Sequence, residues 1–323
     1  MEEEAISPAT VERIQKTISS LPTDNGWRHP LPFYFYQGFW SSQLYLEGII
    51  LAQELFQAEP SDIFICSPPK SGTTWIKALT FAIVTRTRFE NSTNPLLSKT
   101  PHDILPFYER IFSKRWPQIR QPGIPLIATH TPYSCLPKSV QDSNCKIVYV
   151  CRDPKDVFVS LFHFYAKLRL VEHEPLSLDE AFEIFCEGKS PFGPYWNHVL
   201  GYWKASLERP KKVLFLKYED MMKDSALYVK KMAEFVGYPF SLEEEEEGMV
   251  EKIVEMCSFE FLSNLEVNKK GTVESLLNRQ NNFFFRKGTV GDWKNYLTLG
   301  MADRLNKIME QKLSGSGLTL NAS

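Results

Sequence analysis

The sequence predicts an α/β fold, a single domain in which a central parallel sheet is flanked by helices. Four short apolar runs carry this prediction, at residues 63–66, 126–129, 147–151 and 213–216, and helical patterns separate them. None of the runs strictly alternates apolar and polar residues, which is typical of strands covered on both faces. The 323 residues are enough for one domain with a sizeable core.

Composition and charge exclude several classes of protein. Hydrophobic residues make up 43% of the chain and charged residues 24%, and the formal net charge is −2. This balance gives no general nucleic-acid or membrane surface, so an anion site must be local. Residues 1–22 lack the basic start of a signal peptide, and no stretch is apolar for long enough to span a bilayer. We therefore expect a cytoplasmic protein without nucleic-acid or membrane partners.

Neither cysteines nor acidic clusters indicate a metal. The six cysteines form no CxxC pair and have no histidine at zinc-ligand spacing, so we interpret them as packed thiols. Five glutamates at 243–247 follow Ser241, and Glu244 completes a capping box, which indicates the solvated start of a helix. A metal or basic-partner site at these glutamates is the alternative.

Before the first apolar run, we expect two helices with an aromatic segment between them. Residues 10–20 and 41–56 have helical patterns, the second of them amphipathic. Between them, residues 33–40 contain six aromatic side chains. We interpret this segment as packed on the core, with the wall of an aromatic substrate pocket as the alternative.

Between the first and second runs, residues 91–121 are rich in Pro, Ser and Asn. We expect this segment to be irregular and to be a candidate mobile flap over a site. Further helices are predicted at 178–187, where Ser177 and Glu180 form a capping box, and at 195–207 and 225–236.

The stretch at 67–75, Ser-Pro-Pro-Lys-Ser-Gly-Thr-Thr-Trp, links the first run to a helical pattern. A phosphate cradle is built in this way, because backbone N–H groups at a helix N-terminus and a nearby lysine hold an anion. The stretch is not a Walker A motif, since Lys70 precedes Gly72. An ordinary strand-to-helix turn with a capping Ser or Thr explains the stretch alone equally well.

Polar side chains also follow the other three runs. In parallel sheets ligands bind beyond the carboxyl ends of the strands, so these side chains should face one crevice. Each has a structural interpretation when taken singly, as a hydrogen-bonded His, a helix-capping Arg and a packed Tyr. A second basic segment, 284–294, has Arg and Lys before two closely spaced glycines and is either another anion site or a basic surface turn. The side chains that follow the runs are Thr129, His130, Thr131, Arg152, Asp153, Lys217, Tyr218, Glu219 and Asp220.

Two motifs resemble the signature pair of the cytosolic sulfotransferases, Pro-Lys-Ser-Gly-Thr-Thr-Trp at 69–75 and Arg-Lys-Gly-x-x-Gly-Asp-Trp-Lys at 286–294. The resemblance runs from about Gly26 to the end of the sequence. It implies a P-loop-like sulfotransferase domain over 26–323, preceded by a partly mobile helical extension over 1–25. Three further segments are most similar to plant members: Thr-His-Thr-Pro-Tyr at 129–133, Cys-Arg-Asp-Pro-Lys-Asp at 151–156 and Leu-Glu-Val-Asn-Lys at 265–269.

The resemblance implies transfer of a sulfuryl group from 3′-phosphoadenosine 5′-phosphosulfate (PAPS) to a hydroxyl of a small acceptor. The implied acceptors are phenolic or flavonoid, steroid-like, oxylipin or desulfoglucosinolate. Carried over by position, His130 is the general base and Lys70 reaches the leaving oxygen. The 5′-phosphosulfate is assigned to Lys70, Ser71, Gly72, Thr73 and Thr74, the 3′-phosphate to Arg152, Ser160, Arg286, Lys287 and Gly288, and the adenine to Trp75, Tyr218 and Phe259 with Cys257 nearby.

The implied chemistry suits these residue types. A neutral imidazole, with an ordinary pKa of about 6.5, accepts a hydroxyl proton, and Lys70 supplies charge that a metal would otherwise give. Two other functions remain open: a nucleotide-dependent small-molecule kinase with Asp153 as a Mg²⁺ ligand, and a non-catalytic binder of a small ligand. The order of Lys70 and Gly72 and the second basic segment count against the kinase. The acceptor pocket is expected to be lined by Phe39, Trp40, Pro69, Phe164 and Tyr165.

Two departures from the family pattern bear on the chemistry and on assembly. Ala128 stands where many animal members have a lysine two residues before the catalytic histidine. The animal dimer motif is only partial, so we expect a monomer or a weak homodimer. Its matching positions are Lys294, Thr298, Leu299 and Asp303.

Overall fold

The computed structural model describes residues 6–27, 32–90, 92–114, 120–168, 174–273 and 279–320. Its centre is a parallel four-stranded sheet in the order β5-β4-β6-β7. The four predicted apolar runs form these strands, which confirms the α/β prediction. Their bounds are β4 Ile63–Cys66, β5 Leu126–Thr129, β6 Lys146–Cys151 and β7 Val213–Lys217.

Alternating side chains of the strands point into two separate hydrophobic clusters. Ile63 and Ile65 join the cluster under α3 (Thr73–Thr85), α11 (Ser225–Val236) and α13 (Met249–Met256). Phe64 and Cys66 join the other cluster. Helices cover both faces, which explains why the strands are apolar throughout. The helices of the second cluster are α7 (Pro154–Leu168), α8 (Leu178–Cys186), α9 (Tyr195–Glu208) and α16 (Leu299–Leu313).

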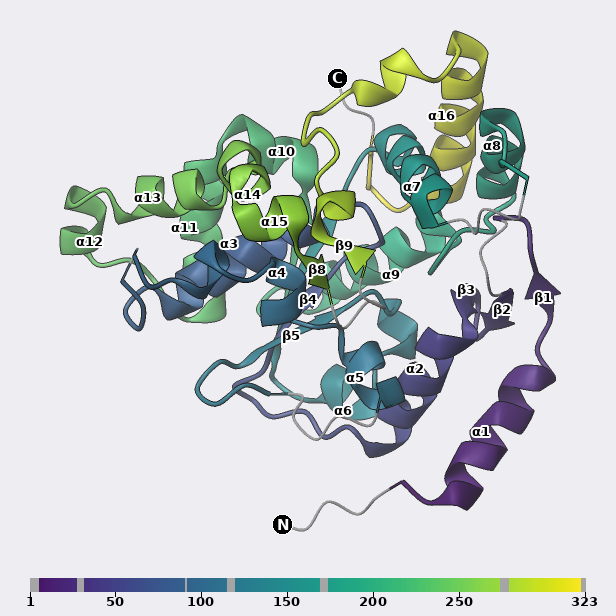
Figure 1. Ribbon diagram of the computed structural model, residues 1–323, viewed down its shortest axis with the longest axis horizontal. Helices are drawn as coiled ribbons and strands as arrows, with labels where there is room; N and C mark the ends of the chain where they lie inside the picture. The colour runs from purple at the N-terminus through teal and green to yellow at the C-terminus, as the bar shows by residue number, and fades with distance from the viewer. Residues whose placement is uncertain are drawn as a thin grey trace.

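In Figure 1 the first group of helices lies at the left, and α7, α8 and α16 lie at the upper right. The capping boxes predicted at Ser177–Glu180 and Ser241–Glu244 are both present, so these helix starts are fixed by local hydrogen bonds. The shorter elements are α6 (Lys138–Asp142), α10 (Tyr218–Lys223), α12 (Leu242–Glu246), α14 (Phe259–Asn264), α15 (Glu266–Lys270), β8 (Thr272–Val273), β9 (Arg279–Gln280) and the 3₁₀ turns Tyr133–Cys135, Asn281–Phe284 and Asp292–Asn295.

The N-terminal region adds a small antiparallel sheet and two helices. Its elements are α1 (Pro8–Ser19), β1 (Thr23–Asp24), β2 (Phe33–Tyr36), β3 (Phe39–Ser42) and α2 (Gln43–Leu55). Arg13 of α1 forms an ion pair with Glu54 of α2 at 2.6 Å. β1 pairs with β2, so residues 23–24 are joined by backbone hydrogen bonds to the segment after them. The proposed division at residues 25 and 26 stays a prediction.

The prediction of irregular structure over 91–121 is wrong for much of the segment. It contains a 3₁₀ turn (Pro95–Leu97), α4 (Pro101–Ile104) and α5 (Tyr108–Lys114). α5 packs closely against α2 at Gly48. A Cβ at this position would stand only 1.6 Å from the Glu109 carbonyl oxygen, so only glycine allows the two helices to come this close. Tertiary contact therefore overrides the local composition here. Residues 91 and 115–119 lie outside the described residues, and the flap stays a prediction.

The described residues contain neither a membrane-spanning helix nor a cluster of metal ligands. No described helix is both long and apolar enough to cross a bilayer. In the same residues, no group of three or more His, Cys, Asp or Glu side chains is arranged to hold a metal ion. The six cysteines are free thiols and five of them are buried.

Candidate active site

A cavity of about 380 Å³ opens at the carboxyl ends of the central strands. One lining residue follows each strand: Lys70 after β4, His130 after β5, Arg152 after β6 and Tyr218 after β7. Because the strands are parallel and in register, their carboxyl ends lie at one edge and these loops converge there.

The structure brings most of the sequence-predicted site residues to this cavity. The lining includes Pro69, Lys70, Gly72, Thr73, Thr74, Trp75, His130, Arg152, Ser160, Phe164, Tyr165, Tyr218, Cys257, Phe259, Arg286, Lys287 and Gly288. Ser71 lies behind the loop with its hydroxyl buried, and this oxygen has no hydrogen-bond partner among the described residues.

Phe39 and Trp40 are not among the described residues that line the cavity, and their assignment to the acceptor pocket stays a prediction. The backbone of Trp40 forms hydrogen bonds with residues 192–193. Its N–H donates to the Gly193 carbonyl at 2.9 Å, and its carbonyl accepts from Phe192 N–H at 2.6 Å. Phe39 is buried and its ring stacks on Phe192. Phe192, which both residues contact, lines the cavity.

The loop after β4 has the backbone shape of an anion cradle. Lys70 and Gly72 both have positive φ, 67° and 102°. A Cβ on Gly72 would stand 2.7 Å from the Tyr218 ring, so only glycine fits there without a shift. The hydroxyls of Ser67 and Thr73 share a hydrogen bond of 2.7 Å. Helix α3 begins at Thr73, and its free N–H groups and dipole favour an anion at this end.

Lys70 is the cation of this cradle. Its Nζ lies 4.3 Å from the centroid of the Phe164 ring. Burial, and then the nearby cations Arg286, Lys167 and Arg152, lower the pKa of Lys70 to about 7. A bound anion would favour the charged form again, so anion binding and protonation of Lys70 are coupled.

His130 is held in one tautomer by a backbone carbonyl. Its Nδ1 lies 2.7 Å from the Ser67 oxygen. A carbonyl only accepts, so Nδ1 carries the proton and Nε2 keeps its lone pair. Burial lowers the pKa of His130 to about 3, which keeps the ring neutral at physiological pH.

The His130 backbone is also fixed, by two buried side chains from other elements. Its N–H donates to Glu109 of α5 at 2.9 Å, and its carbonyl accepts from the His198 Nε2 of α9 at 2.8 Å. Burial raises the pKa of Glu109 to about 7.

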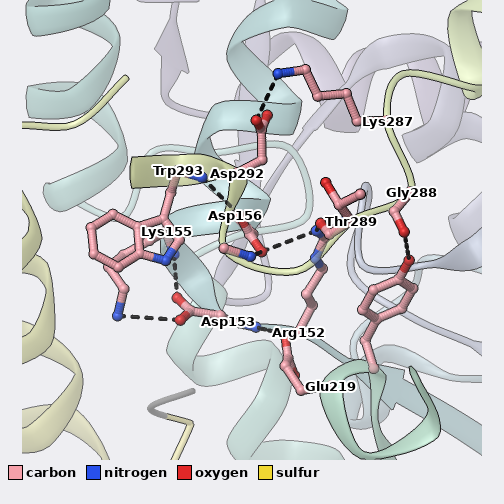
Figure 2. A network of polar contacts seen from close by, with 12 residues as sticks. Arg152, Asp153, Lys155, Asp156, Glu219, Lys287, Gly288, Thr289, Asp292 and Trp293 are labelled. Atoms are coloured by element: carbon pink, nitrogen blue, oxygen red, sulfur yellow. Dashed lines mark hydrogen bonds and ion pairs between the residues drawn. The ribbon is translucent and has the colours of Figure 1, made fainter. Parts of the chain in front are cut away.

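A second region rich in cations joins the start of α7 to the 286–293 segment (Figure 2). Asp156 is fully buried and accepts hydrogen bonds from Arg152 Nη2 at 3.0 Å, Gly291 N at 2.8 Å and Trp293 N at 3.0 Å. Arg152 Nη2 also donates to the Thr289 carbonyl at 2.6 Å. One carboxylate therefore sets both the arginine and the loop that faces it.

Asp292 holds the other two cations of this region. Lys287 Nζ lies 2.7 Å from its Oδ1, and Arg286 pairs with its Oδ2. Burial opposes ionisation of Asp292, but hydrogen bonds from Lys287, Asn295 and Arg286 outweigh it and hold the pKa at about 2. The buried Nε atoms of Arg152 and Arg286 have no hydrogen-bond partner within the described part of the chain.

Aromatic rings stand between the loop after β4 and the second cationic region. Trp75 and Tyr218 are in edge contact, with centroids 5.3 Å apart, and the Tyr218 hydroxyl donates to the Gly288 carbonyl at 3.1 Å. Gly288 has φ +66°, and a Cβ there would stand 2.4 Å from the Phe259 ring. The Gly288 backbone is thus pressed between two rings that line the cavity.

A further arc of aromatic contacts runs along the remaining wall. The His130 ring contacts Phe192 and Phe107, with centroids 5.4 and 4.3 Å apart. Phe284 continues the arc through His102 at 4.2 Å and Phe164 at 6.0 Å. This wall offers flat apolar surface next to the lone pair of His130.

Sequence reasoning missed several residues of the site. Glu109 and His102 fall in the segment expected to be irregular, and His198 lies in the middle of a helix. None has a local motif, and each reaches the site only through the packing of distant elements. The other missed residues on the cavity wall are Ser42, Leu44, Tyr45, Phe107, Arg110, Leu168, Pro191, Phe192, Met222, Ser225, Val254, Ser258, Leu262, Phe284 and Phe285.

A family model for the sulfotransferase domain matches residues 60–317. The chain belongs to the sulfotransferase family. Over 311 residues, this sulfotransferase is 49% identical to flavonol 4′-sulfotransferase of Flaveria chlorifolia, covering 96% of this chain and 97% of the relative. It is also 49% identical to cytosolic sulfotransferase 17 of Arabidopsis thaliana, over 98% of this chain and 94% of that one.

Solved structures show the same fold. An Arabidopsis thaliana protein described as a steroid sulphotransferase matches with a TM-score of 0.76 at 37% identity, over 98% of this chain and 99% of that one. Mouse sulfotransferase SULT7A1, complexed with PAP, matches with a TM-score of 0.67 at 28% identity, over 88% and 95%. The predicted family, fold and enzyme class are confirmed, and the kinase alternative is set aside.

Proposed function

We propose that this sulfotransferase moves a sulfuryl group from PAPS to a hydroxyl of a small, largely apolar phenolic acceptor, with His130 as the general base. The observation that carries the proposal is the fixed tautomer of His130, whose Nε2 lone pair belongs to the same cavity as Lys70, Arg152 and Arg286. PAP, the product that remains after PAPS loses its sulfuryl group, is the ligand of the mouse relative.

The residues present fit a nucleotide with an anionic group at each end. Ser71 Oγ is a buried, unused polar atom beside the cradle at α3, and the two arginine Nε atoms are unused donors at the second region. Gly72 and Gly288 bring backbone close to rings where a Cβ would clash. We assign the 5′ end to residues 70–74 and the 3′-phosphate to Arg152, Ser160 and the 286–288 segment.

In this proposal PAPS supplies an electrophilic sulfur, and the chain supplies positioning and charge. His130 Nε2 takes the proton of the acceptor hydroxyl as its oxygen bonds to sulfur. Lys70 stabilises the negative charge that builds on the phosphate oxygen as the bond between that oxygen and sulfur breaks. Like phosphoryl transfer, this reaction depends mostly on positioning and electrostatic stabilisation.

The acceptor end, which we define as Tyr45, Phe107, Phe164, Phe192 and Phe284, favours a flat aromatic acceptor. These rings line the cavity wall on which His130 also lies. Relatives 49% and 47% identical are named flavonol sulfotransferases, which supports a flavonol among the phenolic acceptors. Apolar pockets discriminate weakly between acceptors of similar shape, so the choice needs a direct comparison.

The test is a screen with ³⁵S-labelled PAPS and four acceptor classes: flavonols, steroids, hydroxyjasmonates and desulfoglucosinolates. We expect magnesium-independent transfer, fastest to a flavonol. Faster transfer to another class would reject the phenolic assignment, and activity only with ATP and Mg²⁺ would reject sulfuryl transfer.

The role of His130 is tested by His130→Ala, which should bind PAP as the unmodified enzyme does but lose turnover. His163→Ala is the matched control, because that ring packs on Tyr296 and is not part of the cavity lining. Unchanged turnover in His130→Ala would remove this residue as the base. Loss of PAP binding would show that the residue holds the structure instead.

We also propose a monomer or weak homodimer in the cytoplasm. Relatives carry the name cytosolic sulfotransferase, which supports this location. Leu299, one of the partial dimer-motif positions, is 82% exposed at the start of α16. Sedimentation velocity over a range of protein concentrations measures the assembly, and a concentration-independent dimer would contradict the proposal.

A further inference from the structure

Three polar side chains form a hydrogen-bonded line behind the phosphate cradle. Thr74 Oγ1 lies 2.9 Å from His102 Nε2, and His102 Nδ1 lies 3.3 Å from Lys77 Nζ. Lys77 and His102 are buried, and both Thr74 and His102 line the cavity. The roles proposed above for His130 and for the cations give this line no function.

The hydrogen-bonding geometry of Lys77 gives the line its direction. Nζ donates to the Leu105 carbonyl at 2.8 Å and lies 3.4 Å from the centroid of the Phe107 ring. Burial lowers the pKa of Lys77 well below its usual value, and Glu109 and Asp103 offset only part of this effect. A carbonyl partner and the face of an aromatic ring are both suited to an ammonium group.

Lys77 Nζ already donates to a carbonyl and faces an aromatic ring, and this arrangement directs a further N–H toward His102 Nδ1. Nδ1 therefore accepts, and the proton of the His102 ring lies on Nε2. That Nε2–H donates to Thr74 Oγ1 and occupies a lone pair of the hydroxyl. The Thr74 proton is then left to point into the cavity. His130 has the opposite tautomer, with its proton on Nδ1 and its lone pair on Nε2. At Nε2, His102 therefore carries a proton and donates, whereas His130 carries a lone pair and accepts.

We propose that Lys77 and His102 are positioning residues that commit the Thr74 hydroxyl to donate a hydrogen bond to the 5′ anionic group of the bound nucleotide. The inference rests on the proposed PAPS site. Without the line, a threonine in the first turn of a helix rotates freely and can turn a lone pair toward the anion. With it, the donor is oriented before binding, which removes an ordering cost.

The first test measures PAP binding by calorimetry. His102→Phe fits among the neighbouring rings of Phe107 and Phe284 but removes both ring nitrogens. We expect it to weaken PAP binding about tenfold, as for loss of a hydrogen bond to a charged group. His102→Gln keeps an N–H near the ε position and should recover most of the affinity. Equal affinity of the unmodified protein and His102→Phe would overturn the proposal.

Thr74→Val and the double variant complete a cycle. Thr74→Val should weaken PAP binding as much as His102→Phe does, and the double variant should be no worse than either one. Additive losses would mean that His102 does not act through Thr74. Thr80→Val is the control, since this buried hydroxyl of the same helix donates to the Ile76 carbonyl and should leave PAP affinity unchanged.

The second test needs no stable variant. In ¹⁵N-histidine-labelled protein, His102 should show a protonated Nε2 and an unprotonated Nδ1, and His130 the reverse. The same tautomer at both residues would overturn the proposal even if His102→Phe failed to fold. If the unmodified protein did not bind PAP at all, the PAPS site itself would be wrong, which is a different result from equal binding by the variants.

Discussion

At the end of the cavity that we assign to the nucleotide, the cations Arg152, Arg286 and Lys287 are each paired with a buried carboxylate. The end that we assign to the acceptor is instead a set of aromatic rings in contact with His130 or with one another. Ionic recognition depends steeply on distance and direction, so the cations must be held before the ligand arrives. Apolar contact depends mainly on area and shape. The nucleotide end should therefore tolerate little change, and the acceptor end more.

The largest effect is expected for Asp156→Ala at the nucleotide end. The change leaves Arg152 without its ion pair and frees two backbone N–H groups. Loss of one partner of a buried pair costs about 3–5 kcal/mol, so the free energy of unfolding in urea should fall by that amount. PAP binding, measured by calorimetry, should be lost.

Asp153→Ala is the matched control for that comparison. Asp153 is equally buried and next to the same helix, but it pairs with Lys155, which does not line the cavity, whereas Asp156 pairs with Arg152, which does. We expect a loss of stability with PAP affinity retained under conditions where the variant is folded. If both variants lost PAP binding alike, the role assigned to Asp156 would be no more than structural.

Next in size is Gly288→Ala, compared with Gly291→Ala. Both glycines have positive φ, 66° and 80°, which costs another residue about 1–2 kcal/mol. Only at Gly288 would the new Cβ meet a ring, at 2.4 Å, whereas at Gly291 the nearest atom is 4.0 Å away. PAP affinity should fall about tenfold in the first variant and remain within about twofold in the second. Equal losses of PAP affinity in the two variants would show that backbone strain, and not contact with the ring, causes the loss.

The third effect is proton uptake by Lys70 when PAP binds. At about pH 8 its amine is mostly neutral, because the pKa lies at about 7, and the bound anion favours the ammonium form. Calorimetry in buffers of different ionisation enthalpy should show uptake approaching one proton at about pH 8 and little at about pH 6. PAP affinity should therefore fall as the pH rises through 7. Lys70→Arg should remove the uptake, and persistent uptake in that variant would assign the proton elsewhere.

The smallest effect is expected at the acceptor end, for Phe192→Leu. Its ring contacts Tyr45 and His130, and aromatic pairs of this kind are worth about 0.5–1.5 kcal/mol. Steady-state kinetics should show the acceptor KM raised by about two- to tenfold, with PAP affinity unchanged. A larger loss of PAP affinity than of acceptor binding would contradict the assignment of Phe192 to the acceptor end.

Much of the fold could be predicted because its signals are local. Apolar runs marked the four strands, and the capping residues Ser177 and Ser241 marked two helix starts through hydrogen bonds three residues away. The helix over 225–236 was predicted at its observed bounds. Helix α5 could not be predicted, since its position depends on α2 and on the close approach at Gly48.

The candidate site divides in the same way. Lys70, His130 and Arg152 could be found because each follows a strand in the sequence, and parallel pairing alone brings strand ends together. Phe39 and Trp40 pack on residues 192–193, far away in the sequence, and no local pattern indicates that contact.

The sequence by itself determined where the four strands lie along the chain, which residue types follow each strand, and the family to which the protein belongs. Only the tertiary structure decided their chemical states. The His130 tautomer is set by Ser67, 63 residues away, and the His102 tautomer follows from Lys77, 25 residues away. Burial likewise lowers the pKa of Lys70 to about 7. Protonation depends on solvent exclusion and on partners in space, and neither is encoded in neighbouring residues.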